Sequence, residues 1–480
     1  MSYINFRFSP QEKTLLKVLL RFSKGRKIKL YLVGGILRDT LLARKKDNLD
    51  FDFCLRRGAI SFGRKFARYI KAGFVVLDKA HGSCRAVKKT KNSIYTFDFT
   101  DFRGKTLEKD LLHRDFTINA IAIELDKVFS GKINDFLIDQ FCGREDLENK
   151  IIRVVHKKAF VEDPLRLLRA FSFAALLGFK IHPETLRFAK KERERLGDVS
   201  GERVREELFK FLSSDAAYEC LDSLSSLKII EIILPEIKKM RGIGQGPYHH
   251  LDIWQHTLET VRQLDILLKD TRDNAEISCY LNEYLCAERK RVALLKLAAF
   301  LHDFGKPSTM RHIKGRTTFH GHERAGLKMA REIAKRLRLS NDETDALGKM
   351  ILWHLRPGYL ADTDKPTERA KFRYFRDAGP ESLSTLLLSL ADQRATKGPL
   401  TTRKAAIQHE RVVHTLIKEY LNKKKEKKPK RLITGDDLIR RFKLEPSPVI
   451  GKILREIEEL QAIGKVKTKK EAILRAGKMI

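Results

Sequence analysis

The residues that decide the fold of the N-terminal part are 32–53, LVGGILRDTLLARKKDNLDFDF. Residues 29–33 favour a β-strand, and the Gly-Gly pair that follows breaks it. Residues 36–44 then have the apolar spacing of a helix. The run therefore predicts a strand, a tight glycine turn and a helix, as in domains that mix both kinds of element.

A second strand is predicted over residues 48–55, shortly after that helix. In it Asp50 and Asp52 alternate with apolar residues, which are Leu49, Phe51 and Phe53. Because side chains repeat every two residues along a strand, we expect both carboxylates on one face, about 7 Å apart, and the apolar side chains buried on the other.

The rest of the chain falls into a mixed part of about 150 residues and a helical remainder. Ser9, Pro10 and Glu12 form the start signature of a helix, and further strands are predicted over residues 74–77 and 93–100. The later helices are predicted at residues 164–178, 202–212, 254–268, 291–304, 323–337, 436–442 and 448–462. Residues 423–431, KKKEKKPKR, have no apolar periodicity and are typical of a solvated linker.

The composition indicates a polyanionic partner. The 480 residues include 97 Lys and Arg against 62 Asp and Glu, a net charge of +35, which attracts phosphates. The longest apolar stretch, residues 294–301, is far below the roughly 20 residues needed to cross a bilayer, and residues 1–10 lack the apolar core of a signal peptide. Six scattered cysteines without a CxxC pair indicate neither disulfides nor thiolate zinc, so we expect a cytoplasmic protein that does not bind membranes.

Asp50 and Asp52 are a candidate Mg²⁺ site, because this ion is commonly bound by one or two carboxylates together with substrate phosphates. Asp98, on the strand predicted at residues 93–100, is a candidate third acid. The alternative is that the pair forms only the solvated face of an amphipathic strand. The glycine turn at 34–35 favours the metal site, because glycine lets a phosphate approach the backbone.

Residues 32–53 resemble the signature of the tRNA nucleotidyltransferase and poly(A) polymerase family, which has a polymerase-β-like nucleotidyltransferase head. Three further motifs follow in the family's order. HRDFTINAIA (113–122) is similar to its RRDFTINA segment, EDPLRLLRAFSFAALLGF (162–179) to its EDxxR helix, and GERVREELFKFL (201–212) to its ERxxxEL helix. The resemblance covers about the first half of the chain and implies an α+β head with a mixed sheet, followed by an all-α neck.

The resemblance also implies roles for individual residues. Asp50 and Asp52, with Asp98, would be catalytic, and the first two would carry Mg²⁺. The nucleotide-binding residues would be Gly34, Gly35, Arg38 and Asp39 around the triphosphate, Arg114, Asp115 and Asn119 at the sugar and phosphates, and Asp163, Arg166 and Arg169 on the selecting helix.

Asp163 and Arg166 would stand in for a template. At i and i+3 they share a helical face, where a carboxylate accepts from a base amino group and a guanidinium donates to a ring nitrogen or carbonyl. The alternative is that Asp163 is the N-cap before Pro164 and that Arg166 or Arg169 is a solvated charge.

Four departures from the family pattern bear on specificity. His113 replaces the first Arg of the RR pair, Ala43 replaces a usual Gly, and Ser172 replaces an Arg. Only residues 100–114 separate the third acid from the DFTINA segment, whereas many members that add the terminal A carry a longer loop there. The short segment resembles the CC-adding branch, so we expect C addition, with addition of the final A left open.

A second set of candidate ligands lies downstream on helical segments. In chain order it comprises His256, His302, Asp303, His322, His354 and Asp392. The order resembles an HD phosphohydrolase domain, in which such residues hold Mn, Ni, Fe or Mg ions that activate water. The alternative is a retired HD fold whose histidines satisfy core hydrogen bonds. His249 and His250 would be secondary contacts.

Together these patterns predict four parts: a head (1–155), a helical neck for nucleotide selection and RNA binding (156–235), an HD body (236–422) and a basic tail that contacts tRNA (423–480). The expected activity is template-independent addition of the 3′-terminal CCA, or CC only, to the 3′ end and acceptor arm of tRNA, from CTP and ATP. In the CC-only case a separate enzyme would add A. The alternatives are a poly(A) polymerase, an HD hydrolase with an inert head, and a non-catalytic RNA-binding protein.

Overall fold

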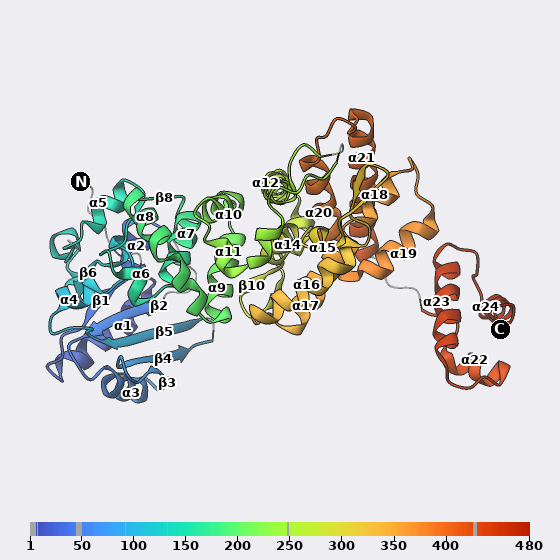
Figure 1. The fold of residues 1–480 in the computed structure, drawn as a ribbon. Coiled ribbons are helices and arrows are strands. Elements are labelled where there is room, and N and C mark those ends of the chain that lie inside the picture. The colour runs from blue at the N-terminus through green and yellow to red at the C-terminus, as the bar shows by residue number, and fades with distance from the viewer. Residues whose placement is uncertain are drawn as a thin grey trace. The chain divides into compact units, whose positions relative to one another are not determined.

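A computed structural model describes residues 6, 8–44, 50–91, 93–131, 133–246, 249–425 and 430–480, without the side chain of residue 425. By internal contacts the chain divides into two units, Met1–Val199 and Ser200–Ile480. Figure 1 traces both from the blue N-terminus to the red C-terminus. Each unit is described by itself.

The first unit is built on one mixed sheet of six strands, in the order β3-β4-β5-β2-β1-β6. Neighbours are antiparallel except β2 and β5, which run parallel. The strands are β1 (Tyr31–Val33), β2 (Asp50–Leu55), β3 (Gly73–Asp78), β4 (Ser83–Lys89), β5 (Ile94–Asp101) and β6 (Ala122–Glu124), and a small parallel pair is formed by β7 (Ile151–Ile152) and β8 (Lys180–Ile181). The helices are α1 (Pro10–Lys24), α2 (Gly35–Leu41), α3 (Ala59–Tyr69), α4 (Leu107–Leu112), α5 (Gly143–Glu148), α6 (Ala159–Glu162), α7 (Arg166–Leu177) and α8 (Pro183–Glu192).

An aromatic core holds the sheet against helix α3. Phe51 stacks on Phe97 at 5.3 Å and Phe53 stacks on Phe99 at 5.6 Å between ring centroids. Phe66 of α3 meets Phe97 and Phe99 edge-on. All five rings are almost fully buried. Such aromatic pairs add roughly 0.5–1.5 kcal/mol each beyond the burial of their area. The core therefore fixes β2 and β5 as rigid neighbours.

The predicted alternation in β2 is confirmed for the described residues: Phe51 and Phe53 are buried, Asp50 is exposed and Asp52 is partly exposed. Residue 49 lies outside the described residues. The predicted strands at 29–33, 74–77 and 93–100 correspond to β1, β3 and β5 within one or two residues.

Strand β4 was not predicted, although it pairs with both β3 and β5. Its sequence, SCRAVKK, has small inward residues and two lysines, so its β-propensity is weak and pairing with its neighbours determines its conformation. The helix predicted at 36–44 is too long. It ends at Leu41, and Ala43 adopts a φ of 53°, a left-handed conformation that glycine adopts more easily and that accounts for the usual Gly there.

The second unit is helical, with two short hairpins that the prediction of an almost purely helical remainder did not include. Its helices are α9 (Gly201–Leu212), α10 (Ala217–Ser226), α11 (Ile230–Ile233), α12 (Ile253–Asp270), α13 (Ala275–Leu281), α14 (Arg291–Leu301), α15 (Lys306–Thr309), α16 (His322–Arg336), α17 (Asn341–Trp353), α18 (Arg356–Ala361), α19 (Glu368–Ala378), α20 (Ser382–Ala395), α21 (Arg403–Lys425), α22 (Gly435–Phe442), α23 (Pro448–Ala462) and α24 (Lys469–Gly477). The hairpins are β9 (Tyr284–Cys286) with β10 (Arg289–Lys290), and β11 (Arg311–Ile313) with β12 (Arg316–Thr318).

Helices α12, α14, α17 and α20 pack on one another to form the centre of this unit. Helix α20 is buried over most of its length, as expected for a helix that is apolar on nearly all sides. No helix among the described residues is long and apolar enough to span a bilayer.

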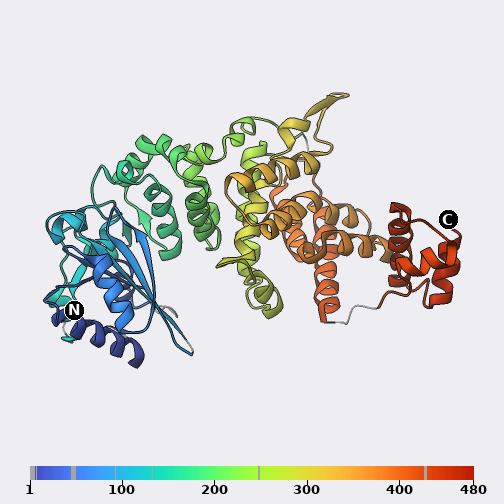
Figure 2. The same ribbon diagram turned by 90° about the horizontal axis from the view of Figure 1, so that it is seen from below.

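The C-terminal helices α22, α23 and α24 lie together, in red in Figure 2, around their own apolar cluster, which includes Leu438, Ile453 and Ile457. The predicted helices at 436–442 and 448–462 are confirmed as α22 and α23. The predicted linker is shorter than expected, because α21 continues to Lys425. Residues 426–429 lie outside the described residues.

Candidate functional site

The first candidate site lies where β1 turns into α2 beside β2. Gly34 has φ 77° and ψ −142°, a conformation that is nearly restricted to glycine. A Cβ at this position would lie 3.3 Å from Asp52 Oδ2 and 3.6 Å from Arg114 Nη1. Glycine therefore leaves the space in which the Asp52 carboxylate and the Arg114 guanidinium face the turn.

Asp98 lies directly beside Asp52, because the parallel register of β2 and β5 pairs these two residues. Burial and the Asp98 carboxylate raise the pKa of Asp52 to about 6, and Arg114 partly opposes this. Arg85 of β4 donates to both Asp98 oxygens, at 2.8 Å each. Asp52 and Asp98 thus lie side by side, and Arg85, which the sequence analysis missed, is bound to Asp98.

Carboxylates gathered in this way fit a divalent cation. Asp50 is exposed, and the pKa of Asp52 is raised mainly by burial and secondly by the neighbouring Asp98 carboxylate. Oxygen ligands of this kind suit Mg²⁺. Arg114 Nε is buried and has no hydrogen-bond partner among the described residues.

Five other predicted nucleotide-binding residues form one network next to this turn, and all but Arg169 are buried. Arg38 donates from Nη1 to Asn119 Oδ1 at 2.9 Å and pairs with Asp39 at 2.9 Å. Asn119 donates to Asp115 Oδ1 at 3.0 Å, and Arg169 of α7 donates to Asp115 Oδ2 at 2.6 and 3.0 Å. The network therefore connects α2, the DFTINA segment and α7.

The two residues proposed to select the base are partly engaged in local hydrogen bonds. Asp163 Oδ1 accepts from the Leu165 N–H at 3.2 Å, as a cap of the turn before α7. This turn takes up Pro164 and Leu165, so the helix predicted from residue 164 begins at Arg166. Asp163 has an extended backbone and lies outside the helix, so the prediction that it shares a helical face with Arg166 is wrong. Arg166 is buried and donates to the main-chain oxygen of His113 at 2.6 Å. The contact from the Leu165 N–H to Asp163 therefore agrees with the alternative in which Asp163 caps the start of a helix.

The second candidate site is in the helical unit, where the six predicted ligands gather into two groups. These are His256, His302 and Asp392, and Asp303, His322 and His354, with the ligand atoms of each group within 4.8 Å of one another. His322 Nε2 lies 3.4 Å from Asp303 Oδ1, and His302 Nε2 lies 3.2 Å from Asp303 Oδ2. Asp303 therefore connects the two groups.

Main-chain carbonyls orient three of these imidazoles. The Nδ1 atoms of His302, His322 and His354 lie 2.7, 2.9 and 2.6 Å from the carbonyl oxygens of Ala299, Phe319 and Ile351. An N–H at Nδ1 leaves the Nε2 lone pair directed at the centre, which is how ligating histidines are usually held. Burial and the other two histidines lower the pKa of His354 to about 3, so it is the neutral imidazole that metals bind.

His302 Nε2 and Asp303 Oδ1 are buried and make no hydrogen bond. Buried polar atoms without partners are unfavourable. Their convergence on one point therefore fits the predicted metal centre better than an HD fold that has lost its metal. Lys306 Nζ lies 2.6 Å from Asp303 Oδ2. His249 packs edge-on against His256, at 4.8 Å between ring centroids, so it is next to a ligand as expected.

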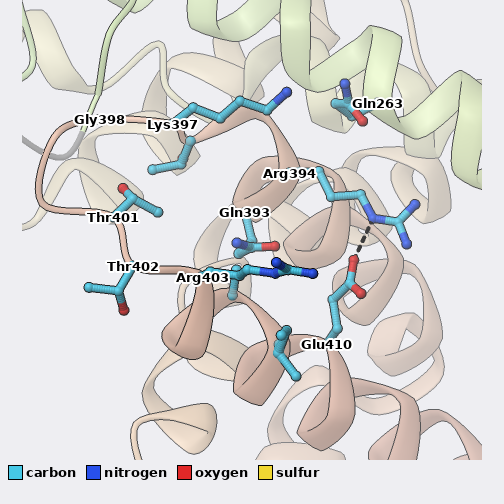
Figure 3. A pocket seen from close by; sticks show the side chains of 12 residues that line it. Gln263, Gln393, Arg394, Lys397, Gly398, Thr401, Thr402, Arg403 and Glu410 are labelled. Carbon is cyan, nitrogen blue, oxygen red and sulfur yellow. Dashed lines mark hydrogen bonds and ion pairs between the residues drawn. The ribbon is translucent and has the colours of Figure 1, made fainter.

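A cavity of about 670 Å³ opens onto this centre, lined by His354 and Asp392. A neighbouring pocket of about 500 Å³ shares part of its wall and adds Lys397 and Arg403. In Figure 3 Arg394 is held by Glu410, at 2.8 Å. Lys397 and Arg403 give the neighbouring pocket a positive charge that suits a phosphate group.

The fold and the two sites define a nucleotidyltransferase-type head followed along the chain by a helical region with an HD centre. Comparisons agree with this class. A "Poly A polymerase head domain" model matches residues 30–153, a "Probable RNA and SrmB- binding site of polymerase A" model residues 178–240, and an "HD domain" model residues 253–397. A tRNA nucleotidyltransferase domain 2 model matches residues 326–476.

Curated relatives cover almost the whole chain. An A-adding tRNA nucleotidyltransferase of Deinococcus radiodurans is 30% identical, over 92% of this chain and 93% of its own length. A CC-adding enzyme of Thermus thermophilus is also 30% identical, over 92% and 91%. A CCA-adding enzyme of Thermotoga maritima, solved in complex with tRNA, has a TM-score of 0.62 at 24% identity, over 98% and 96% of the two chains. The chain belongs to the tRNA nucleotidyltransferase/poly(A) polymerase family with an HD domain.

Proposed function

We propose that this protein transfers nucleotides to the 3′ end of tRNA. The observation that carries the proposal is the placement of Asp50 and Asp52 on β2 beside the Gly34 turn, in a chain of this family. An exposed and a partly exposed carboxylate next to an open glycine turn provide what a metal-dependent phosphoryl-type transfer needs.

In the proposed reaction the tRNA 3′-hydroxyl oxygen attacks the α-phosphorus of CTP or ATP. A new oxygen–phosphorus bond forms, the bond to the bridging oxygen of the β-phosphate breaks, and pyrophosphate leaves while the hydroxyl proton passes to solvent. Asp50 and Asp52 would hold Mg²⁺, with Asp98 beside them, and this ion would lower the pKa of the hydroxyl and offset the charge on pyrophosphate. Arg114 would donate to a phosphate oxygen through Nη1, which faces the Gly34 turn. Positioning and charge compensation would supply most of the rate.

Base selection would lie with Asp163 and Arg166. Arg166 donates to main-chain oxygens of His113 and Ala159, so pairing with a base requires it to exchange at least one of these acceptors for the nucleotide. Arg169 would act one turn further along, through Asp115, to keep α7 in place. Gly35, Arg38, Asp39 and Asn119 would support the triphosphate side of the pocket.

For specificity we propose robust addition of C. The segment 100–114 forms no long free loop: α4 occupies it, with Leu107 and Leu111 in an apolar cluster. The Asp110 carboxylate accepts from the Arg103 N–H at 3.0 Å. A short segment of this kind resembles the CC-adding branch, in which a separate enzyme would complete the end with A.

A-addition is the second candidate, because the Deinococcus radiodurans relative, similar over almost the whole chain, is an A-adding enzyme. The two are distinguished by incubating the protein with tRNA that ends at the discriminator base, at C and at CC, with CTP, ATP or all four triphosphates, followed by sequencing of the products. Arrest at CC supports the proposal, and A added only after CC supports the second candidate. A complete CCA end refutes the CC-only form, and a homopolymer of A indicates a poly(A) polymerase.

We also propose that the HD centre hydrolyses phosphoesters. The observation favouring this activity is the set of three imidazoles held by carbonyls around Asp303, beside a cavity that His354 and Asp392 line. Mn, Ni, Fe or Mg would bind to the six ligands, and damaged tRNA ends that carry cyclic phosphates are the substrate to test.

Paired variants separate the two activities. His302→Ala should abolish hydrolysis of a 2′,3′-cyclic phosphate and leave nucleotide addition intact, and Asp50→Ala should do the reverse. Unchanged hydrolysis in His302→Ala would exclude this centre. An Asp50→Ala variant that keeps nucleotide addition would contradict the proposed head chemistry.

The four-part division at residues 155, 235 and 422 is kept as a proposal, with the neck and the basic tail as RNA contacts and the cytoplasm as the place of action. The net charge of +35 supports tRNA as the polyanion. Filter binding of tRNA against a duplex DNA of equal charge tests this assignment, because a protein that only attracts charge would not discriminate between them.

A further inference from the structure

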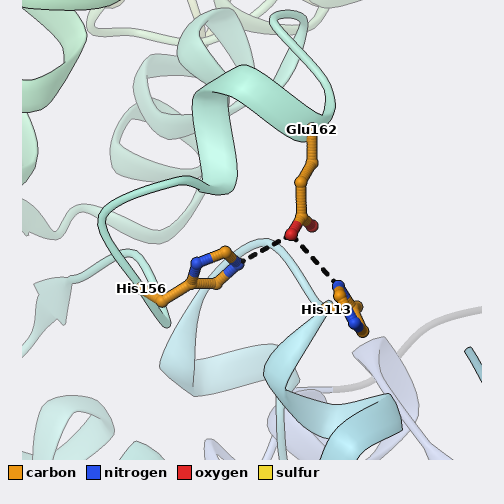
Figure 4. A group of neighbouring side chains, drawn as sticks. All are labelled: His113, His156 and Glu162. Carbon is orange, nitrogen blue, oxygen red and sulfur yellow. Dashed lines mark hydrogen bonds and ion pairs between the residues drawn. The ribbon is translucent and has the colours of Figure 1, made fainter. Parts of the chain in front are cut away.

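A third group of possible ligands lies outside both candidate sites, within the first unit. His113 follows α4, His156 precedes α6, and Glu162 is the last residue of α6. Figure 4 shows the two imidazoles turned toward one carboxylate from different segments. Their ligand atoms all lie within 4.8 Å of one another.

The spacing of these atoms is that of a metal site. His113 Nδ1 lies 3.1 Å and His156 Nε2 lies 3.3 Å from the same oxygen, Glu162 Oε1. For Zn²⁺ with bonds of about 2.0–2.1 Å, two ligands of a tetrahedron are roughly 3.4 Å apart. The side chains are 37%, 20% and 29% exposed, in the order His113, His156, Glu162, so an ion can enter from solvent and keep water as its fourth ligand.

The second oxygen of Glu162 has a different neighbour. Glu162 Oε2 lies 3.4 Å from Arg166 Nη1, and the His113 carbonyl accepts from Arg166 Nη2 at 2.6 Å. Two of the three prospective ligands therefore also contact Arg166. An ion on Oε1 leaves these contacts in place and fixes the segments that make them.

We propose that His113, His156 and Glu162 bind one Zn²⁺ ion, and that the bound ion holds Arg166 on its main-chain acceptors and thereby slows nucleotide addition. Coordination through His156 Nε2 requires its proton on Nδ1, so the 3.3 Å contact from the Lys158 N–H to that atom must open. The slowing of nucleotide addition rests on the proposed function, whereas the binding of Zn²⁺ does not.

The binding test uses the full chain, freed of metal with a chelator and dialysed against Zn²⁺, with bound metal counted per chain. His156→Gln should bind one ion fewer than the parent. His113→Arg, which restores the family's residue, should do the same and guards against a folding defect in the first variant. His81→Gln is the matched control, because His81 pairs with Asp78 at 2.8 Å and no third ligand lies near them among the described residues.

Co²⁺ serves as a spectroscopic probe, because four-coordinate and six-coordinate Co²⁺ differ in visible absorption. The parent and His81→Gln should gain the tetrahedral band, and the other two variants should lack it. Equal zinc counts in all four proteins, or an unchanged band, would overturn the site.

The kinetic test adds Zn²⁺ to the nucleotide addition assay at saturating Mg²⁺ and compares each protein with its own zinc-free rate. Zn²⁺ should slow the parent and His81→Gln and should leave His156→Gln at its zinc-free rate. Equal slowing in all proteins would overturn the regulatory half. A chain that adds no nucleotide but loses one ion in His156→Gln would refute the proposed function and keep the zinc site.

Discussion

The link between Asp115 and Arg169 allows a quantitative prediction for Asp115→Asn. The Asp115 carboxylate is buried. It accepts two hydrogen bonds from Arg169 and one each from Asn119 and the Phe116 N–H. Burial alone would raise the pKa of Asp115, but Arg169 and these hydrogen bonds lower it from 3.8 to about 2. This difference corresponds to about 2 kcal/mol of stability at neutral pH.

The sign follows from linkage. Because the folded pKa is below the unfolded one, the contribution is complete above about pH 5 and is lost as the pH falls from 3.8 through about 2. Asparagine keeps the shape but cannot ionise. The free energy of unfolding of the parent should therefore exceed that of Asp115→Asn by about 2 kcal/mol at pH 7 and by roughly half of that near pH 3.

Urea unfolding followed by thiol labelling measures this difference. Cys54 and Cys84 are buried in the head sheet, so their labelling reports unfolding of that unit. Asp437→Asn is the control: the pKa of Asp437 is also lowered to about 2, by hydrogen bonds from Lys469 and Thr434, but its site is open to solvent and belongs to the second unit. A parent–variant difference that is the same at both pH values would refute the reasoning.

Three further predictions concern the head and the RNA. Asp52→Asn should lower nucleotide addition by about 10²-fold or more, as loss of one charge-stabilising group does, while tRNA affinity in filter binding stays unchanged; a smaller loss contradicts the role of the pair. Gly34→Ala should cost roughly 1–3 kcal/mol in urea unfolding because of its positive φ, and should also impair addition by crowding Asp52. Gly58 also has a positive φ, 87°, but a Cβ there would meet no described atom within 4 Å. Gly58→Ala should therefore cost stability without impairing addition, and equal activity in both variants argues against crowding. The logarithm of the tRNA association constant should fall linearly with the logarithm of salt concentration, and a flat dependence would exclude a charge-driven contact.

The sequence predicted the elements whose signal is local. The alternation around Asp50, the glycine turn and the helix at 448–462 each depend on neighbours along the chain, and the structure has them. Strand β4 has no such local pattern, and it exists because β3 and β5 pair with it. Arg85 could not be found for the same reason, since it faces Asp98 only after this pairing.

The candidate sites divide in the same way. The six predicted HD ligands were chosen because their order resembles that of an HD domain, and the structure brings them together in two groups. The main-chain bonds of Arg166 and the approach of His156 to Glu162 depend on how loops fold back onto α6 and α7. No spacing in the sequence encodes such contacts, so they emerge only from coordinates.

The bridge from Arg38 through Asn119 and Asp115 to Arg169 has a consequence for protein engineering. An exchange of the EDxxR helix between relatives that add different nucleotides would separate Arg169 from the carboxylate that anchors it. Under the proposed role of this helix, such a chimera should inherit the donor's preference only when the DFTINA segment is transplanted with it, so the unit that could be exchanged between enzymes would include both segments.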